Sequence, residues 1–168
     1  MYNIIKDYTA IEVGYVNGPI TVAQAKAFCR ADNTTASQDT LFALWIRAAR
    51  TKIEQYTGLS LIPRNIVAVL SNPQGDMELP FGPVNNTPTF IDTEGVTQAI
   101  TTYGIKFLYV KTPFEYSKVT YTAGYAECPE ELQQAMLLQI CFWWENRGDQ
   151  ESNGYAPGVI AICQKWKR

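Results

Sequence analysis

The sequence contains no histidine. Histidine is the usual general base near neutral pH and the commonest metal ligand, so its absence removes the ordinary centre of both kinds of site. No G-x-S-x-G motif marks a serine nucleophile, and the glycines form neither G-x-G-x-x-G nor G-x-x-x-x-G-K-[ST]. We therefore predict no enzyme activity, no cofactor and no metal site. A small enzyme of an unrecognised type would need a deep pocket with convergent polar groups.

Three further features are scarce. The formal net charge is −2, so the chain lacks the basic excess typical of nucleic-acid-binding proteins. The four cysteines are scattered without a C-x-x-C motif, which favours reduced thiols in a cytosolic compartment. No apolar run reaches ~18 residues, and no apolar stretch precedes Lys6 and Asp7, so we expect neither a membrane span nor a signal peptide.

The most informative stretch runs from Ser117 to Arg147 and predicts a strand, a tight turn and a long helix. Apolar and polar residues alternate over 119–122, which is typical of a half-buried strand. Pro129 suits the first turn of a helix. From Ala135 to Trp144 only Gln139 is polar, so the helix is apolar on almost every side. Such a helix has neighbours on several sides, from its own core or from another subunit.

Two more helices are predicted before it. Thr21 and Gln24 have the spacing of a capping box, and the helix that they start ends near Arg30. A second helix starts at Ser37 or Asp39 and ends before Gly58. Its apolar arc contains Leu41, Phe42, Leu44, Trp45, Ile46, Ala48, Ala49, Ile53 and Tyr56. Its opposite face carries Asp39, Arg47, Arg50, Thr51 and Glu54, which we interpret as a solvated face.

The middle of the chain is predicted to be β. The expected strands lie at 61–70, 77–79, 89–91, 97–100, 103–110 and 117–122, with a further short strand at 8–16 and a turn at 92–95. A last short helix is predicted over 157–163. The fold class is therefore α+β, mainly a helical bundle with long central helices packed with a small antiparallel β-sheet.

No residues form a convincing catalytic set, so the candidates are contact residues. Trp143 and Trp144 point about 100° apart on a helix, so one can enter the core while the other anchors an interface; both in one core is an equal alternative. Arg47 and Arg50 could meet phosphates, although we favour a solvated helix face as their explanation. Glu127, Glu130 and Glu131 suit a helix N-terminus better than an acid–base pair. The tail offers an apolar patch and a basic end: Val159, Ile160, Trp166, Lys167 and Arg168.

The order of several segments resembles a known family. ITVAQAKAFCRAD is followed by LFALWIRAARTKIEQYTGLSLI, then ELPFGPV, then VTYTAGYAECPEELQQAMLLQICFWWENRG. Together they resemble the head–tail connector (adaptor, head-completion) proteins of tailed bacteriophages, from Ile20 to about Gly148. The chain departs from the family at Cys29, where an aliphatic residue is expected, and in its long N-terminal arm. The implied division is an arm over 1–19, a connector domain over 20–148 and a tail over 149–168.

The resemblance implies a structural protein without catalysis. Copies would form a ring, usually of twelve, beneath the portal protein. The ring would contact the next head-completion or tail protein and extend the channel for genomic double-stranded DNA, without sequence-specific binding and without a membrane. The tail would reach a neighbouring protein, and the portal is the expected one. The implied location is the virion, with the host cytoplasm before assembly. A DNA-packaging accessory or DNA-binding protein is the alternative, and tight, salt-sensitive DNA binding would favour it.

Overall fold

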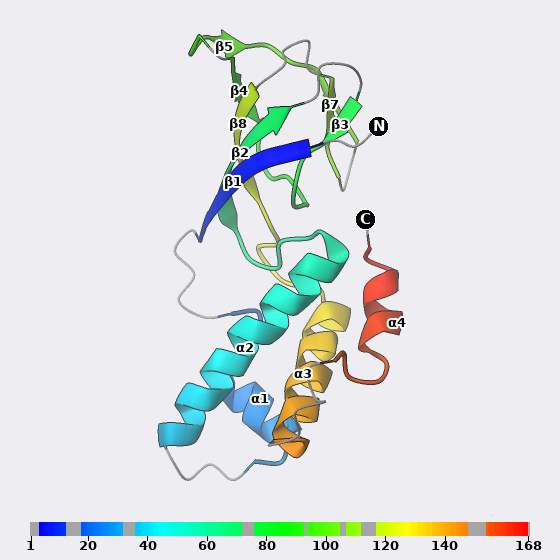
Figure 1. Cartoon of the computed structure of the whole chain (residues 1–168). Helices are drawn as coiled ribbons and strands as arrows, with labels where there is room; N and C mark the ends of the chain where they lie inside the picture. Colours follow the sequence, from blue (N-terminus) through cyan, green and yellow to red (C-terminus); the bar gives the residue numbers. More distant parts are fainter. Residues whose placement is uncertain are drawn as a thin grey trace. The chain divides into compact units, whose positions relative to one another are not determined.

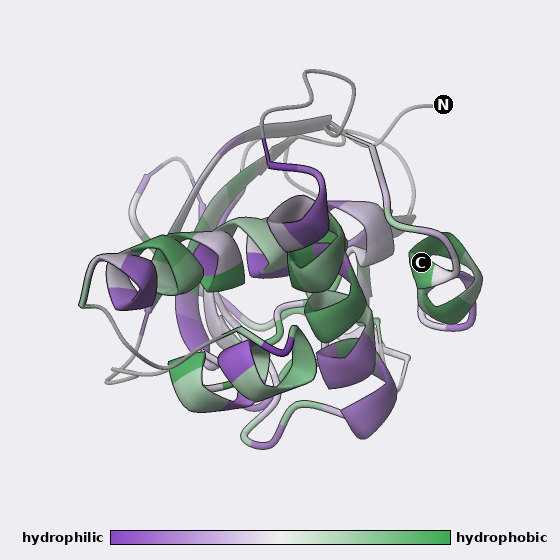
Figure 2. Ribbon diagram, turned by 90° about the horizontal axis from the view of Figure 1, so that it is seen from below, coloured by the Kyte–Doolittle hydropathy of each residue, from purple (hydrophilic) through white to green (hydrophobic). Residues whose placement is uncertain are grey.

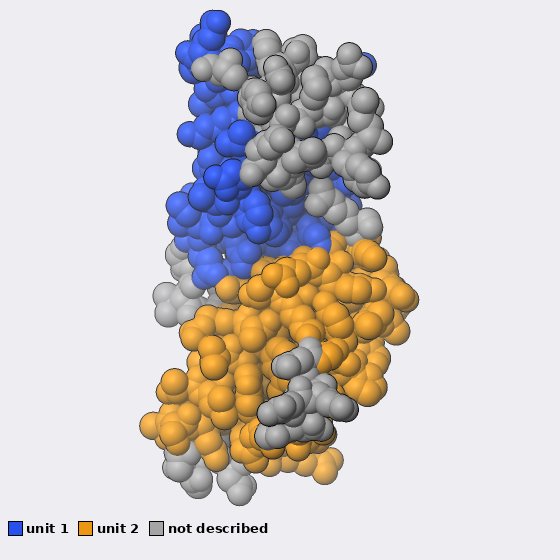
Figure 3. All heavy atoms as spheres, in the orientation of Figure 1, with its two compact units in different colours: residues 1–15, 58–126 blue, residues 16–57, 127–168 orange. Residues whose placement is uncertain are grey.

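The computed structural model describes residues 4–12, 18–31, 36–71, 76–92, 94–104, 107–111, 117–147 and 154–167. The chain divides into two compact units (Figures 1 and 3). Residues 1–15 and 58–126 form the β unit, and residues 16–57 and 127–168 form the helical unit. The helical unit is therefore assembled from two segments that the β unit separates in the sequence.

The helical unit contains α1 (Val22–Phe28), α2 (Ala36–Thr57), α3 (Glu130–Glu145) and α4 (Val159–Gln164). The predicted capping box of α1 is confirmed: the Gln24 backbone N–H donates to Thr21 Oγ1 (3.2 Å), and the Thr21 N–H donates to Gln24 Oε1 (2.8 Å). Gly58 follows α2 with φ 73°, so the predicted glycine at its C-terminal end is also confirmed.

The core of the helical unit forms around α3, which contacts α1, α2 and α4. Its fully buried positions are Leu132, Ala135, Met136, Gln139 and Ile140. Phe42, Ile46, Ala49 and Ile53 of α2 are also buried. The all-round apolar character of α3 thus corresponds to three neighbouring helices of its own unit. The short α4 is itself mostly hydrophobic (green beside the C-terminus in Figure 2).

The β unit contains two antiparallel sheets. The five-stranded sheet has the order β1-β2-β8-β4-β5, and the three-stranded sheet has the order β3-β7-β6. The strands are β1 (Ile4–Glu12), β2 (Arg64–Ser71), β3 (Asp76–Glu78), β4 (Thr89–Ile91), β5 (Thr97–Gln98), β6 (Thr102–Tyr103), β7 (Tyr109–Lys111) and β8 (Ser117–Ala123). No helix of the described chain belongs to this unit. Its buried apolar residues lie on the strands and on the segments between them, which contribute Leu59, Leu61, Ile62 and Leu79.

Alternation along the strands sets the β core. On β8, Val119 and Tyr121 are buried, and they pair in register with Ala68 and Ile66 of β2. With Met77, Leu79, Phe90, Val110 and Ala123 they form one apolar cluster. The Tyr121 hydroxyl donates to the Pro80 carbonyl, which satisfies the one polar atom that Tyr121 brings into this cluster.

Gly124 ends β8 where no other residue would fit. Its φ is 118°, and a Cβ added there would lie 2.0 Å from the Ile62 carbonyl oxygen. Its N–H donates to the Pro83 carbonyl (2.9 Å). The tight turn predicted between the strand and the long helix is therefore confirmed, and the required backbone conformation explains why glycine stands at this position.

Three expectations are wrong in detail. The single strand predicted over 103–110 is a hairpin of β6 and β7; Gly104, directly after β6, has φ 112°, a conformation that interrupts a strand. Arg50 and Glu54, assigned to a solvated face, are 8% and 3% exposed, and the pairing of their charges (Nε–Oε2 4.0 Å) offsets part of the cost of burying them. Leu44, assigned to the apolar arc, is 52% exposed.

The fold class α+β is confirmed, although "mainly helical" understates the strands, which form a compact unit of their own. Of the strand predicted over 8–16, residues 8–12 belong to β1, and residues 13–16 lie outside the described part of the chain. The division into arm, connector domain and tail is one of function and stays a prediction.

Candidate functional site

The tail is folded onto the helical unit. Within α4, Val159 and Cys163 are fully buried, whereas Ile160 is 40% exposed. Contacts of α4 with α3 and α2 account for this burial. The helix therefore has an inner face that holds it to its own unit and an outer face that is open. Of the candidate contact residues, Val159 belongs to the inner face and Ile160 to the outer one.

Gln139 fixes the beginning of the tail. Its side chain is fully buried in α3; the amide Nε2 donates to the Gly154 carbonyl (3.2 Å), and Oε1 accepts from the Ala156 N–H (3.0 Å). A buried amide with both ends bonded specifies one path for the backbone that it touches. The single polar residue in the apolar stretch of α3 is thus the residue that positions the tail.

Trp166 and Glu131 fix the other end of the tail. The Trp166 indole N–H donates to Glu131 Oε2 (2.8 Å), and Lys165 Nζ lies 3.5 Å from Glu131 Oε1. The indole hydrogen bond, followed by the charge of Lys165, holds the pKa of Glu131 below its usual range. Glu131 was interpreted only as a helix N-terminal charge, and its partner could not be identified without the docked tail.

Cations and aromatic rings add contacts between the tail and α2. Lys52 Nζ lies 4.6 Å from the ring centroid of Tyr155 and 5.9 Å from that of Trp143. Lys167 Nζ lies 5.2 Å from the ring centroid of Tyr56, which itself packs edge-on against Tyr155. Such contacts contribute of order 0.5–1 kcal/mol each at partly exposed sites. Lys167 is therefore placed against its own unit, and Arg168 lies outside the described residues.

The two neighbouring tryptophans have different surroundings. Trp144 packs on Phe42 and Trp45 of α2, with ring centroids 5.1 and 6.2 Å away, and the Arg147 guanidinium lies 3.7 Å from its ring centroid. Trp143 is turned toward Lys52. Both indoles are half-buried, so each keeps an accessible edge. Neither the interface interpretation nor the core interpretation is thereby decided, and the interface role stays a prediction.

The candidate basic residues of α2 are not brought together. Arg47 is exposed, whereas Arg50 is buried beside Glu54. Lys26 is also buried, and its ammonium group pairs with the Asp39 carboxylate. Of the two candidates Arg47 and Arg50, Arg47 is therefore the one that is open to a partner.

The arrangement of thiols and carboxylates does not favour catalysis. Burial raises the pKa of Cys29 and Cys128 to about 12 and that of Cys163 to about 11, so these thiols stay protonated near neutral pH and are poor nucleophiles. Among the described residues, no group of three Cys, Asp or Glu side chains could hold a metal ion.

No helix in the described part of the chain is long and apolar enough to cross a membrane.

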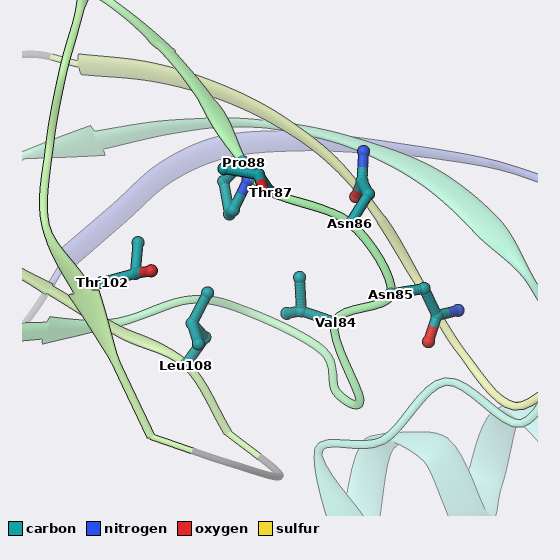
Figure 4. Close-up of a pocket in the computed structure, with 7 residues that line it drawn as sticks. All are labelled: Val84, Asn85, Asn86, Thr87, Pro88, Thr102 and Leu108. Atoms are coloured by element: carbon teal, nitrogen blue, oxygen red, sulfur yellow. The ribbon is translucent and has the colours of Figure 1, made fainter.

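The β unit has a surface hollow of about 380 Å³. Val84, Asn85 and Asn86 lie across it from Thr102 and Leu108 (Figure 4). Both asparagines are used structurally: Asn85 Nδ2 donates to the Gly124 carbonyl (2.6 Å), and Asn86 Oδ1 accepts from the Thr122 N–H (2.6 Å). The lining side chains that the structure describes are amides, hydroxyls and apolar groups without a titratable group, so this described part of the hollow does not show the convergent chemistry of an active site.

Comparison with known proteins gives the family. The family described as head completion protein (HCP) matches residues 19–158. Among solved structures, the chain is similar to one described as the virion of a native gene transfer agent (GTA) particle, with 25% identity, a TM-score of 0.70 and 95% of each chain covered. No curated protein sequence matches the chain.

Two further solved structures share the fold. One is described as the neck of an empty GTA particle computed with C6 symmetry, with 23% identity, a TM-score of 0.71 and 95% of each chain covered. The other is described as the neck of a native GTA particle computed with C12 symmetry, with 24% identity, a TM-score of 0.63, and 95% of this chain and 94% of that chain covered.

Proposed function

The chain belongs to the head completion protein family, and from this premise we propose that it is a ring-forming connector between the head and the tail of a phage or phage-like particle. Copies form a ring, a dodecamer in the particle, beneath the portal. The ring extends the DNA channel and completes the head after DNA packaging. The match over residues 19–158 carries this proposal, because it includes residues 58–126 of the β unit and most of the helical unit. The 12-fold and 6-fold symmetry of the similar neck structures supports a ring.

The proposed partners follow from that position. They are further copies of the chain, the portal protein on one side, and the next head-completion or tail protein on the other. Genomic double-stranded DNA passes through the channel without sequence-specific binding. The role is structural and involves no catalytic step. The protein exists in the host cytoplasm before assembly and in the virion afterwards.

We propose that the folded tail contacts the portal. Val159 and Cys163 anchor α4 in the helical unit, which leaves Ile160 and the exposed part of Trp166 to meet a partner. Lys167, although it lies against Tyr56, and Arg168, which lies outside the described residues, are proposed to add a basic end to this contact. A tail that is folded before docking loses less conformational freedom on binding than an unfolded one. Chains truncated after Gly148 should not join heads, and Ile160→Asp should weaken joining without unfolding the protein. Normal joining by the truncated chain would contradict this role.

Trp143, Trp144 and Arg47 are proposed contacts between neighbouring copies or with a partner. The two indoles are half-buried and Arg47 is exposed, so each can still be covered. Arg50, buried beside Glu54, and Val159, buried on the inner face of α4, can only support such a surface from within in this conformation. Arg47→Ala should therefore impair ring formation more than it affects stability.

The alternative function, a DNA-packaging accessory or DNA-binding protein, makes a different prediction about affinity. A connector has to let DNA slide, and the net charge of −2 suits weak contact. We expect a dissociation constant for linear duplex no tighter than roughly 10⁻⁵ M at physiological salt, which is a non-specific level. Nanomolar binding in a fluorescence titration would favour the accessory protein.

The proposed function is tested by adding purified protein to portal-bearing, DNA-filled heads that lack it. Electron micrographs should show a ring at the portal vertex, and the particles should become able to accept tails. A monomeric protein in free solution would be consistent with this result, because the portal can provide the template for the ring. Heads that bind no protein at the portal vertex would contradict the proposal.

A further inference from the structure

The β unit has one long sheet edge. β1 and β5 border the five-stranded sheet, and β3 and β6 border the three-stranded sheet. β5 and β6 each have two residues and β3 has three, whereas β1 has nine. Short edge strands are one way in which natural proteins prevent pairing with other chains. Among the described edge strands, β1 is the one that is long enough to pair with a strand of another chain.

β1 does carry other protective features, namely three charged residues (Lys6, Asp7 and Glu12) and a register irregularity near its start, but they leave the stretch between Asp7 and Glu12 unbroken. Ile4–Glu12 contains no proline, and its pairing with β2 is irregular only between Ile5 and Asp7. From Asp7 to Glu12 the register runs without interruption against Val69 to Arg64. Two large apolar side chains of this stretch are exposed: Tyr8 at 51% and Ile11 at 65%. A long, regular edge with exposed apolar residues is the kind that adds a further strand.

We infer that β1 is an assembly edge, along which a neighbouring copy of this chain adds an extended segment. The inference rests on the proposed ring, which requires a contact between copies. Added strands gain affinity from main-chain hydrogen bonds and specificity from the side chains between them. Contacts in a cyclic ring join two different surfaces of each subunit, so β1 meets a surface of the neighbour other than the neighbour's β1.

Charge supports a second copy as the occupant. The exposed carboxylates of Asp7 and Glu12 flank the apolar stretch of β1, and Glu12 also lies 3.9 Å from the Arg64 guanidinium. The same unit exposes Lys111 on β7 and Lys118 on β8. Each copy therefore carries both an acidic edge and basic strand residues that can face the acidic edge of the next copy.

Charge also disfavours a simple dimer of two β1 strands. In an antiparallel pair centred on Tyr8–Ile11, Asp7 of one copy would lie opposite Glu12 of the other. Like charges directly opposite each other destabilise strand pairing. The edge is thus better suited to a heterologous contact, which continues around a ring, than to an isologous contact, which stops at two copies.

The first test compares two lysine substitutions. Ile11→Lys places a charge on the long edge. Val96→Lys is the control, because Val96 is likewise an exposed apolar residue (52%, against 65% for Ile11) but lies beside the short edge strand β5. Thermal melting should show that both variants fold. On portal-bearing heads, Ile11→Lys should need about tenfold or more protein to form the ring, whereas Val96→Lys should match the wild type. Equal ring formation by wild type and Ile11→Lys would overturn the inference and leave the proposed function intact.

The second test identifies the occupant. A photo-crosslinking amino acid at position 11, in protein assembled on heads, should yield a product of two copies whose crosslinked peptides both come from this chain. Crosslinks between position 11 of both copies would indicate an isologous pair and would contradict the head-to-tail arrangement. Crosslinks to another particle protein would overturn the inference. If wild-type protein formed no ring on heads at all, the proposed function would fail and this inference with it.

Discussion

The two units of this protein are stabilised in different ways. The cluster at the centre of the β unit is apolar, and its Tyr121 hydroxyl is satisfied by a backbone carbonyl. The helical unit buries Lys26, Arg50, Glu54 and Gln139. Among the residues that the structure shows to be buried, no charged residue belongs to the β unit. Apolar burial provides stability with little directional preference, whereas buried polar groups penalise every arrangement that leaves them unbonded. The β unit thus resembles a scaffold, and the helical unit specifies where the tail is placed.

The largest expected effect separates the two cores. Phe42 and Phe90 are 0% and 1% exposed, one in each unit. Phe42→Ala and Phe90→Ala should each lower the free energy of unfolding by about 3–5 kcal/mol, because each leaves a cavity. Hydrogen exchange should then show that protection falls mainly in the unit that carries the substitution. Equal loss of protection in both units from either substitution would show that the two units open together.

A smaller effect is expected at Gln139. Gln139→Ala leaves the Gly154 carbonyl and the Ala156 N–H without the partner seen in the structure, which should cost about 1–3 kcal/mol. Gln134, exposed on the same helix, is the matched control, and Gln134→Ala should change stability by less than about 0.5 kcal/mol. Amide exchange should accelerate over α4 and not over the β strands. Unchanged protection of α4 in Gln139→Ala would mean that the amide does not position the tail.

Trp143 tests how much a half-buried residue contributes. Full burial would predict a loss of about 3–5 kcal/mol for Trp143→Ala, but the indole is only half-buried, so we expect about 1–2 kcal/mol in chemical denaturation. The effect on ring formation on heads should be larger than this loss of stability explains. A stability loss above about 3 kcal/mol with unaltered assembly would place Trp143 in the core and remove it from the proposed interface.

The smallest effect concerns pH. The indole of Trp166 and the charge of Lys165 lower the pKa of Glu131 from its ordinary value of 4.5. A lowered carboxyl pKa stabilises the docked tail above the ordinary value, and this contribution is lost as pH falls through the pKa of the folded protein. The NMR signal of the Trp166 indole N–H should therefore shift below pH 4.5. In Glu131→Gln the shift should be absent; if it persisted, another group would be responsible.

Local signals predicted much of this structure. The Thr21 capping box, the end of α2 at Gly58 and the hairpin between β4 and β5 depend on residues close together in sequence. In that hairpin, Asp92 Oδ1 accepts from the Glu94 and Val96 N–H groups, both at 2.9 Å. The resemblance over Ile20–Gly148 is confirmed by the family match over residues 19–158, and with it the head–tail connector role in a phage-like particle.

Other features depend on contacts that local patterns do not encode. The i,i+4 spacing of Arg50 and Glu54 is visible in the sequence, but the burial of both side chains is not. The role of Gln139 requires a contact with the tail at Gly154, fifteen residues further along the chain. Residues of the β unit separate α2 from α3 in the sequence, and only the folded structure shows that the two helices contact each other. A polar residue within an apolar helix was the one signal that could have identified Gln139. The interface roles of Trp143, Trp144, Arg47, Arg50, Val159, Ile160, Trp166, Lys167 and Arg168 stay predictions.

The central claim is that this protein completes the head. Its most direct test is deletion of the gene from the phage or phage-like element that encodes it, followed by electron microscopy and measurement of the DNA retained in the particles. We predict tailless heads that package DNA and then lose it, and purified protein added before the loss should restore both DNA retention and tail attachment. Deletion particles that carry normal tails and keep their DNA would contradict the account.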